Sequence, residues 1–290
     1  MTERIVITAL AVLAQALVQA TGPIEISARA RSLRPGEVVV LTIAGPGVSD
    51  AVRVRAFDRD VATYRDGDTW RAIVGVDLDV KPGNYRVTAE SGAAANGARG
   101  THVLRIVSRT FRTRRLTVDE AFVTPPASEQ PRIERESALL AATWRSSATG
   151  RLWTTPFMRP VPQAANSAFG SRSIFNGKPR TAHGGADFLS PAGTPIRAPN
   201  AGRIAVARKL YFSGNTVIID HGLGVFSTLA HLSTIDVREG ELVTPGQRIG
   251  LVGATGRVTG PHLHWAVRAG DARVDPLSLL AVLGPPASAP

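Results

Sequence analysis

Turn signals at short, regular intervals are the feature that most restricts how this chain can fold. Between about residues 22 and 107, turns rich in glycine and proline separate short segments in which apolar and charged residues alternate. Val-Arg-Val-Arg-Ala at 52–56 and Tyr-Arg-Val-Thr at 85–88 are examples. This alternation is typical of strands with one buried face, and several short strands at such spacing predict a small β-sandwich.

The remainder of the chain continues this pattern after one interruption. We interpret residues 108–150 as a connector that packs against one or both β regions. The segment opens with an arginine cluster, which we expect to be solvated, with contact to an anionic polymer as the alternative. The segment then predicts a helix from about Pro131 to Arg145, with Ile133, Leu140 and Trp144 along one stripe. From about residue 152 glycines again punctuate the sequence, and Thr-Val-Ile-Ile at 216–219 is typical of a buried strand.

The predicted fold is therefore mainly all-β, with a helical connector between two β regions. The Lys-Pro-Gly-Asn turn at 81–84, followed by Tyr-Arg-Val, resembles the late hairpin of bacterial immunoglobulin-like modules. We expect a signal peptide at 1–20, an immunoglobulin-like β-sandwich at 21–108, a connector with a helix at 109–150, a C-terminal antiparallel β-sheet domain at 151–284 and a flexible tail at 285–290.

The first twenty residues have the layout of a secretory signal. A short charged start precedes an apolar run at 5–18. Val-Gln-Ala at 18–20 then places small residues at the positions that a signal peptidase recognises. An uncleaved membrane anchor and a buried N-terminal helix are the alternatives. No later stretch is apolar enough to cross a bilayer. We expect an exported mature protein without a membrane span, in the periplasm or at the cell wall outside the cell.

The cysteine count and the charge restrict ligands and partners. The 290 residues contain no cysteine, so any metal must be bound by His, Asp or Glu. The formal net charge of +11 comes almost entirely from arginine and favours an anionic partner such as a cell wall. No zinc finger, recognition helix or RNA-binding motif is present, so nucleic acid is not expected to be the partner.

Histidine clusters near the C-terminus, where five of the six histidines lie between residues 183 and 264. His262 and His264 are two apart in a predicted strand, so both imidazoles can face one site. His-Gly-Gly-Ala-Asp at 183–187 reads as a loop entering a strand. Zinc hydrolases commonly use three nitrogen or oxygen ligands and leave one position for water. Each pair alone is weak evidence of a metal site, but the two pairs together with His231 indicate one.

From about residue 168 to 280 the sequence resembles the lysostaphin-like, LytM-type zinc metallopeptidases, which cut peptides of bacterial cell walls. The segments that carry the resemblance occur in order, at 169–172, 183–188, 191–196, 214–222, 230–233, 246–250, 256–264 and 274–276. The resemblance covers somewhat more than a third of the chain. It implies that the C-terminal domain is a zinc peptidase with one Zn²⁺ ion and peptidoglycan peptides as substrate.

The resemblance also assigns roles to individual residues. It implies that His183, Asp187 and His264 bind the metal, and that His231 and His262 flank the bound water as catalytic residues. An unligated imidazole can accept a proton from water or stabilise an oxyanion, and which of the two is the general base stays open. We expect a structural or second-sphere role for His221 and a structural or surface role for His102.

One position departs from the family pattern. The residue two before His231 is often an aromatic residue in this family, commonly tyrosine, and here it is Leu229. The alternative function is a non-catalytic cell-wall-binding or hydrolase-activating protein on the same fold, and a regulatory protein partner is also compatible with the N-terminal domain. A purely structural β protein with unrelated histidines would not explain the ordered motifs.

Overall fold

The computed structural model describes residues 23–46, 48, 51–92, 97–117, 123–165 and 169–285. The predicted signal peptide at 1–20 lies outside these residues, and of the predicted tail at 285–290 only Pro285 lies within them. Within the described ranges, no helix combines the length and the apolar character that a membrane span requires.

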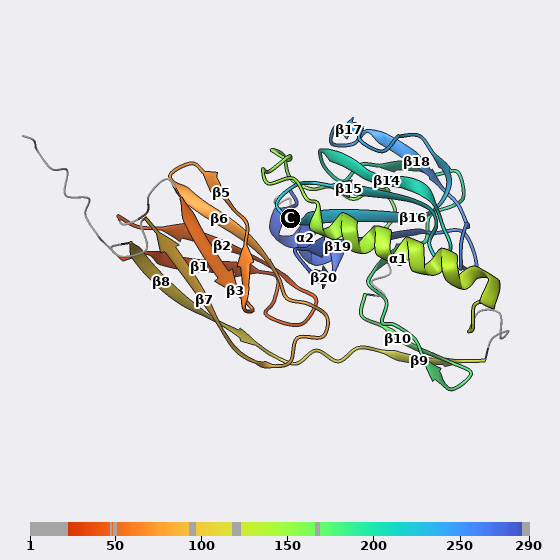
Figure 1. Cartoon of the computed structure of the whole chain (residues 1–290), viewed down its shortest axis with the longest axis horizontal. Helices are drawn as coiled ribbons and strands as arrows, with labels where there is room; N and C mark the ends of the chain where they lie inside the picture. The colour runs from red at the N-terminus through yellow and green to blue at the C-terminus, as the bar shows by residue number, and fades with distance from the viewer. Residues whose placement is uncertain are drawn as a thin grey trace, which may run out of the picture.

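Two four-stranded antiparallel sheets form the N-terminal part of the molecule, which lies at the left of Figure 1. Its strands are β1 (Glu25–Ala30), β2 (Val38–Ala44), β3 (Val52–Ala56), β4 (Arg59–Val61), β5 (Thr63–Asp66), β6 (Thr69–Gly75), β7 (Gly83–Ser91) and β8 (Ala98–Ile106). One sheet has the order β1-β2-β6-β5 and the other β4-β3-β7-β8. Buried side chains from both sheets share one apolar core, so this part is a β-sandwich, called the sandwich below.

A strand and a helix connect the sandwich to the rest of the chain. Strand β9 (Thr113–Leu116) is followed by the short 3-10 helix η2 (Ala127–Glu129) and by helix α1 (Gln130–Arg145), close to the predicted helix. Leu140 and Trp144 of α1 pack against buried residues of the C-terminal sheet, and Figure 1 shows α1 (lime green) running along that sheet. The apolar stripe predicted from the sequence thus fixes the helix to the sheet.

The C-terminal region is built on a nine-stranded sheet, with the main order β12-β19-β16-β15-β14-β17 and with β13, β18 and β20 paired beside this path. The strands of the sheet are β12 (Gly185–Phe188), β13 (Pro195–Arg197), β14 (Gly202–Leu210), β15 (Gly214–Asp220), β16 (Val225–Ile235), β17 (Leu242–Val243), β18 (Arg248–Val252), β19 (Leu263–Ala269) and β20 (Ala272–Val274). All their pairings are antiparallel, and helix α2 (Pro276–Leu283) follows the last strand. The predicted fold class, mainly β with a sandwich, a helical connector and an antiparallel C-terminal sheet, is confirmed.

A separate three-stranded sheet lies below the nine-stranded sheet in Figure 1. It has the order β11-β10-β9, and its strands β10 (Arg172–Phe175) and β11 (Lys178–Pro179) form a hairpin. Strand β9 from the connector pairs with β10 in parallel, with Thr113 opposite Arg172 and Leu116 opposite Phe175. The connector is therefore tied into the C-terminal region and is not a solvated linker along its whole length.

The sandwich and the C-terminal region share an apolar interface because strand β2 is buried on both faces. Val39 and Leu41 belong to the sandwich core, whereas Val38 and Val40 belong to the core of the C-terminal region. The two parts approach so closely that a Cβ atom added to Gly75 of β6 would lie 2.5 Å from the Cβ of Ala272.

Buried charges join the two parts beside this apolar contact. The side chains of Glu37 and Asp275 are 3% and 0% exposed, and Nη2 of Arg31 lies 2.6 Å from Oε1 of Glu37 and 2.8 Å from Oδ2 of Asp275. Arg109 lies 3.5 Å from the same two carboxylates. The hydroxyl of Ser278 donates to Oε2 of Glu37 at 2.7 Å. Each buried carboxylate therefore meets arginine, as burial of charge requires.

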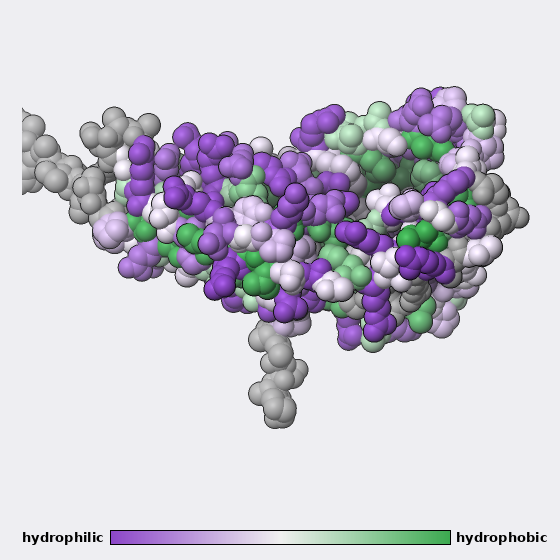
Figure 2. All heavy atoms as spheres, turned by 90° about the horizontal axis from the view of Figure 1, so that it is seen from below, coloured by the Kyte–Doolittle hydropathy of each residue, from purple (hydrophilic) through white to green (hydrophobic). Residues whose placement is uncertain are grey.

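Outer surfaces of the two parts differ in character. Figure 2 shows that the sandwich is covered mostly by hydrophilic residues (purple) on that face, whereas hydrophobic residues (green) gather in a hollow in the half that carries the C-terminal region. An apolar hollow rimmed by polar residues is a common setting for a binding site.

Candidate metal centre

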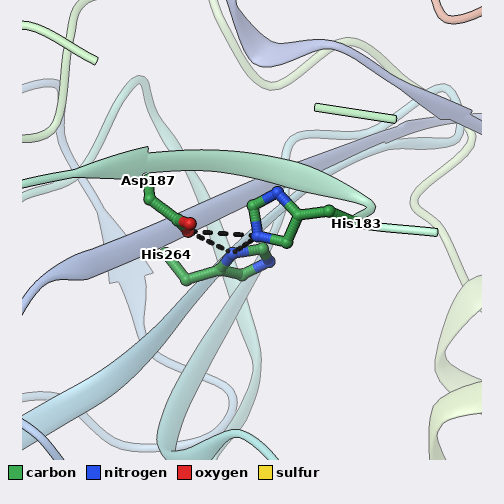
Figure 3. Close-up of side chains that lie close together, drawn as sticks. All are labelled: His183, Asp187 and His264. Atoms are coloured by element: carbon green, nitrogen blue, oxygen red, sulfur yellow. Dashed lines mark hydrogen bonds and ion pairs between the residues drawn. The ribbon is translucent and has the colours of Figure 1, made fainter. Parts of the chain in front are cut away.

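Three side chains from separate positions in the sequence converge at one edge of the C-terminal sheet. Nε2 of His183 lies 3.0 Å from Nδ1 of His264 and 3.1 Å from Oδ1 of Asp187, and Nδ1 of His264 lies 2.9 Å from the same oxygen. Figure 3 shows the two rings and the carboxylate pointing toward one another. We call these three residues the His-Asp-His group.

The strand register explains why these side chains meet. Strands β12 and β19 are antiparallel neighbours in which Asp187 lies directly opposite His264, and directly opposed residues project to the same face. His183 lies just before β12 and its backbone N–H donates to the carbonyl of Ser171 at 2.9 Å. Two strands and one anchored loop thus position the three donors, and the pairing of β12 with β19 brings the His183–Asp187 motif to His264, which lies 77 residues after Asp187 in the chain.

Gly185 is required by the packing of the His264 ring. A Cβ atom at residue 185 would lie 2.7 Å from Cε1 of His264 and 2.5 Å from the carbonyl oxygen of Trp265. At the preceding residue, Gly184, an added Cβ would meet nothing within 4 Å. The second glycine of the His-Gly-Gly-Ala-Asp motif therefore makes room for the ring of His264, whereas the first has no such constraint.

The donor atoms of the group suit a divalent metal ion. The two nitrogens and one oxygen all lie within 4.8 Å of one another. Ligands held at about 2.0–2.1 Å by a tetrahedral zinc ion are about 3.3 Å apart, close to the spacing found here. Two imidazoles and one carboxylate are also a donor set that catalytic zinc sites use. The residues present therefore fit a zinc ion with one further coordination position.

The protonation states in the group also suit metal binding. Burial raises the pKa of Asp187, but hydrogen bonds with His183 and His264 lower it more, so the pKa lies well below its usual value. Burial lowers the pKa of His264, although Asp187 opposes this effect. The group thus offers an ionised carboxylate and a neutral imidazole, which are the forms that bind metal ions.

His231 and His262 lie beside the group, and a hydrogen bond at Nδ1 fixes the tautomer of each ring. Nδ1 of His231 is 2.9 Å from the carbonyl oxygen of Thr255, and Nδ1 of His262 is 2.9 Å from that of Gly260. A carbonyl can only accept, so each Nδ1 carries the proton and each neutral ring has its lone pair on Nε2. Nε2 of His262 lies 3.9 Å from Oδ1 of Asp187.

His231 has two further features of a functional residue. Its φ of 68° lies in the left-handed region, which residues other than glycine adopt rarely and which is found at strained functional sites. Burial lowers its pKa to about 4, against an opposing hydrogen bond to the carbonyl of Thr255. The imidazole of His231 is therefore neutral at pH 7 and can accept a proton.

The other predicted histidines lie away from the group. Nδ1 of His221 is 2.7 Å from the carbonyl oxygen of Ala201, its Nε2 is 2.9 Å from the hydroxyl of Ser227, and its ring packs edge-on against Phe157. These contacts fit the expected structural role of this buried residue. His102 lies on β8 of the sandwich, far in the fold from the His-Asp-His group.

Leu229, where the family pattern often has an aromatic residue, is fully buried in the core of the C-terminal region. It pairs with Val217 of β15 and with Trp265 of β19. In this chain the position therefore contributes apolar packing, and it supplies no hydroxyl to the site.

A cleft with a volume of about 730 Å³ contains the His-Asp-His group and the two flanking histidines. Its walls also contain residues that sequence reasoning did not select as site residues, from the β10–β11 hairpin and from two loops of the nine-stranded sheet: Ser171, Ser173, Phe175, Arg180, Thr181, Phe212, Ser213, Arg257, Val258 and Thr259. Residues 256–259 lie within one of the motifs noted in the sequence, whereas Phe175 and Arg180 carried no signal.

The sequence and the fold of this chain are similar to those of known proteins. The sequence model of Peptidase family M23 matches residues 181–276. A crystal structure from Pseudomonas aeruginosa, assigned to peptidase M23, is 34% identical, with a TM-score of 0.67, and the similarity covers 86% of this chain and 95% of that one. It thus extends over both the sandwich and the C-terminal region.

Two curated relatives are similar to this chain over about a third of its length. The peptidoglycan DD-endopeptidase ShyA of Vibrio cholerae is 48% identical over 83 residues, which are 29% of this chain and 19% of that protein. The peptidoglycan DD-endopeptidase ShyB of the same organism is 43% identical over 93 residues, which are 32% and 22% of the two chains. The similar region thus spans about a fifth of the length of these relatives.

Proposed function

This chain belongs to peptidase family M23, and we propose that it is a zinc endopeptidase that hydrolyses the peptide cross-links of peptidoglycan. One observation carries the proposal: three donor atoms from two strands and a loop lie 2.9–3.1 Å from one another inside a cleft. Similarity to two peptidoglycan DD-endopeptidases supports a cross-link between D-amino acids as the bond that is cut.

In the proposed mechanism, His183, Asp187 and His264 would hold one zinc ion through the atoms that now face one another. The ion, when bound, would supply Lewis acidity toward a water molecule and the scissile carbonyl. The single carboxylate leaves the site with a net charge of +1, which preserves that acidity. Gly185 and the β12–β19 register keep the ligands in place and add no chemistry themselves.

His231 and His262 would handle protons and negative charge during hydrolysis. Each ring is anchored through Nδ1 to a carbonyl and presents Nε2 on the side away from that anchor. In this tautomer Nε2 can accept a proton from the attacking water, and once protonated it can donate to the oxyanion or to the leaving amine. We assign the base to His231 because burial lowers its pKa and so keeps the ring unprotonated at neutral pH, and because its backbone adopts a strained conformation beside the His-Asp-His group.

We also propose that the protein acts outside the cytoplasm, in the periplasm or at the cell wall, where peptidoglycan lies. The layout of residues 1–20 and the names of the curated relatives support export. The net charge of +11 suits a substrate whose peptides carry free carboxylates.

The test uses the full chain purified without added chelator. Zinc content is measured by mass spectrometry of the elements, and purified cross-linked wall peptides are digested and analysed by liquid chromatography with mass spectrometry. We expect one zinc per chain, cleavage of dimers into monomers with the gain of one water, and loss of cleavage with a chelator that zinc restores. Absence of both metal and cleavage would refute the proposal. Bound zinc without cleavage would instead favour a non-catalytic wall-binding protein.

A further inference from the structure

Two arginines that the proposed mechanism does not use line the cleft. Arg180 directly follows strand β11, and Arg257 lies in the loop between β18 and β19. Both line the same cleft as the His-Asp-His group and the two flanking histidines. The two guanidinium groups come from separate segments, so the fold itself brings them to one cavity.

Each guanidinium is held by aromatic rings or backbone rather than by acidic side chains. Nη1 of Arg180 donates to the carbonyl of Val123 at 2.8 Å, and its guanidinium carbon lies 5.8 Å from the ring centroid of Phe175. The guanidinium carbon of Arg257 lies 4.7 Å from the ring centroid of Phe212. Aromatic faces orient a guanidinium and leave its N–H donors available at the edges.

No carboxylate in the described part of the chain pairs with either group. Among the described residues that line the cleft, Asp187 is the only acidic one, and its Oδ1 faces His183 and His264. Burial lowers the pKa of Arg257, and the positive charge of Arg180 lowers it further. Two like charges at one cavity favour the binding of an anion between or beside them.

We propose that Arg180 and Arg257 form a carboxylate-binding subsite, which holds a free carboxylate of the substrate peptide while the scissile amide lies at the His-Asp-His group. This inference rests on the proposed function and adds a determinant of substrate choice to it. Guanidinium binds carboxylate through paired, charge-assisted hydrogen bonds, and two such groups can hold both oxygens. The subsite would therefore select wall peptides with free carboxylates over peptides in which these groups are amidated.

The first experiment compares two forms of one substrate. Cross-linked peptide dimers are prepared from peptidoglycan, and half of the sample is amidated at its carboxylates with a carbodiimide and ammonia. Hydrolysis of both forms is measured with the full chain and with Arg180→Gln, Arg257→Gln and the double variant. Arg105→Gln is the matched control, because Arg105 is exposed on β8 of the sandwich and its replacement removes the same charge away from the cleft.

We expect the native chain to prefer the free-carboxylate dimer by about 10- to 100-fold in kcat/KM, the range expected for a charge-assisted hydrogen bond. Each cleft variant should reduce this ratio, the double variant should bring it near one, and the rise in KM should exceed the fall in kcat. Arg105→Gln should keep the native ratio. A native ratio near one, or a ratio that the double variant leaves unchanged, would overturn the subsite.

The second experiment measures binding without turnover. The full chain is treated with a chelator, and the side-chain Nε–H signals of arginine are followed by NMR during titration with each dimer. We expect the signals that disappear in Arg180→Gln and Arg257→Gln to shift with the free-carboxylate dimer and to shift less with the amidated one. Equal shifts with both dimers, or no shifts, would overturn the subsite.

The two experiments separate the subsite from the proposed function. Selective shifts with no hydrolysis by the zinc-loaded native chain would support the subsite and refute the peptidase. Hydrolysis with equal kinetics on both dimers would support the peptidase and refute the subsite.

Discussion

Charged side chains lie at the interface between the sandwich and the C-terminal region and also in the cleft around the His-Asp-His group. The two places differ in whether these charges are paired with opposite charges. At the interface, Glu37 and Asp275 are buried and each meets Arg31 and Arg109. In the cleft, Arg180 and Arg257 meet no carboxylate among the described residues. Charges that hold a fold together are matched within the protein, whereas charges left unmatched beside a cavity are available to a ligand.

The largest effect of a substitution is expected at the His-Asp-His group. His264→Ala removes a donor of the group and should abolish zinc binding, with kcat/KM reduced more than about 10³-fold because the chemistry of the metal is lost. Circular dichroism should show that the chain remains folded, and zinc content is measured on the dialysed variant. A variant that retains zinc and activity would break the assignment of this group as the metal site.

The flanking histidines should lose activity without losing metal. His231→Ala and His262→Ala should lower kcat by about 10²- to 10⁴-fold, the usual contribution of a positioned acid or base, while zinc content stays at one per chain. The larger effect is expected for His231, and steady-state kinetics with metal analysis checks both. Loss of zinc in either variant would make that histidine part of the metal site instead.

At the interface, the matched charges should affect stability alone. Glu37→Ala leaves Arg31 and Arg109 with one carboxylate between them and removes the partner of the Ser278 hydroxyl. We expect the free energy of unfolding to fall by about 3–5 kcal/mol, as for a broken buried ion pair. Chemical denaturation measures this change, with zinc affinity expected to stay native.

Glu90→Ala is the matched surface control for this prediction. The side chain of Glu90 is 40% exposed, and it lies 3.3 Å from Arg99 and 4.0 Å from Arg53. A surface pair of this kind contributes no more than about 1 kcal/mol. Equal destabilisation by Glu37→Ala and Glu90→Ala would show that the interface charges do not stabilise the contact.

At His221 we expect an effect of pH on stability, because this ring is buried and its hydrogen-bond partners all lie within the protein. Burial lowers its pKa to about 4, below the value of about 6.5 expected in the unfolded chain. As pH falls below 6.5 the unfolded chain binds the proton first, so stability is complete above that pH and is lost toward pH 4. The loss reaches about 3 kcal/mol, since each pKa unit corresponds to about 1.4 kcal/mol.

Denaturation curves between pH 4 and 7, recorded with a chelator so that zinc loss does not contribute, measure this dependence. His221→Asn should be less stable at pH 7 and should show a shallower fall with pH than the native chain. An unchanged slope would mean that another group, such as His231 with its similarly lowered pKa, accounts for the acid sensitivity.

The smallest effect is expected at a residue that carries no donor atom. Gly185→Ala should displace the ring of His264 and weaken zinc binding by about 10- to 100-fold, as displaced supporting groups do at other metal sites. Gly184→Ala should leave the affinity native, because an added Cβ there meets nothing within 4 Å. Competition with a calibrated chelator compares the two variants, and equal affinities would contradict the role given to Gly185.

Local patterns in the sequence predicted much of this molecule. Alternation and turn residues predicted the strands of the sandwich, and an apolar stripe predicted a helix within one residue of where α1 begins. The period of a strand predicted that His262 and His264 face one site, and the structure places both beside Asp187. The roles of these residues as ligands and catalysts remain predictions, as do the domain boundaries.

Such local patterns did not predict contacts between segments that are distant in the sequence. Nothing local indicates that β9 pairs with β10 in parallel, or that Arg109 lies between Glu37 and Asp275 and is not part of a solvated linker. Arg180 likewise reaches the cleft only because the β10–β11 hairpin is placed there by that pairing. Each of these contacts depends on tertiary packing, which short-range periodicity does not encode.

Strand β2 should couple the unfolding of the two halves, because its two faces belong to two different cores. A strand shared in this way cannot lose one set of neighbours without exposing apolar residues to the solvent, so the two halves should melt cooperatively in a single calorimetric transition. Truncation before the connector would leave Ala272, Leu279 and other residues of the second half uncovered. The second half produced alone should therefore aggregate, and the first half is a required part of the folded protein rather than a detachable domain.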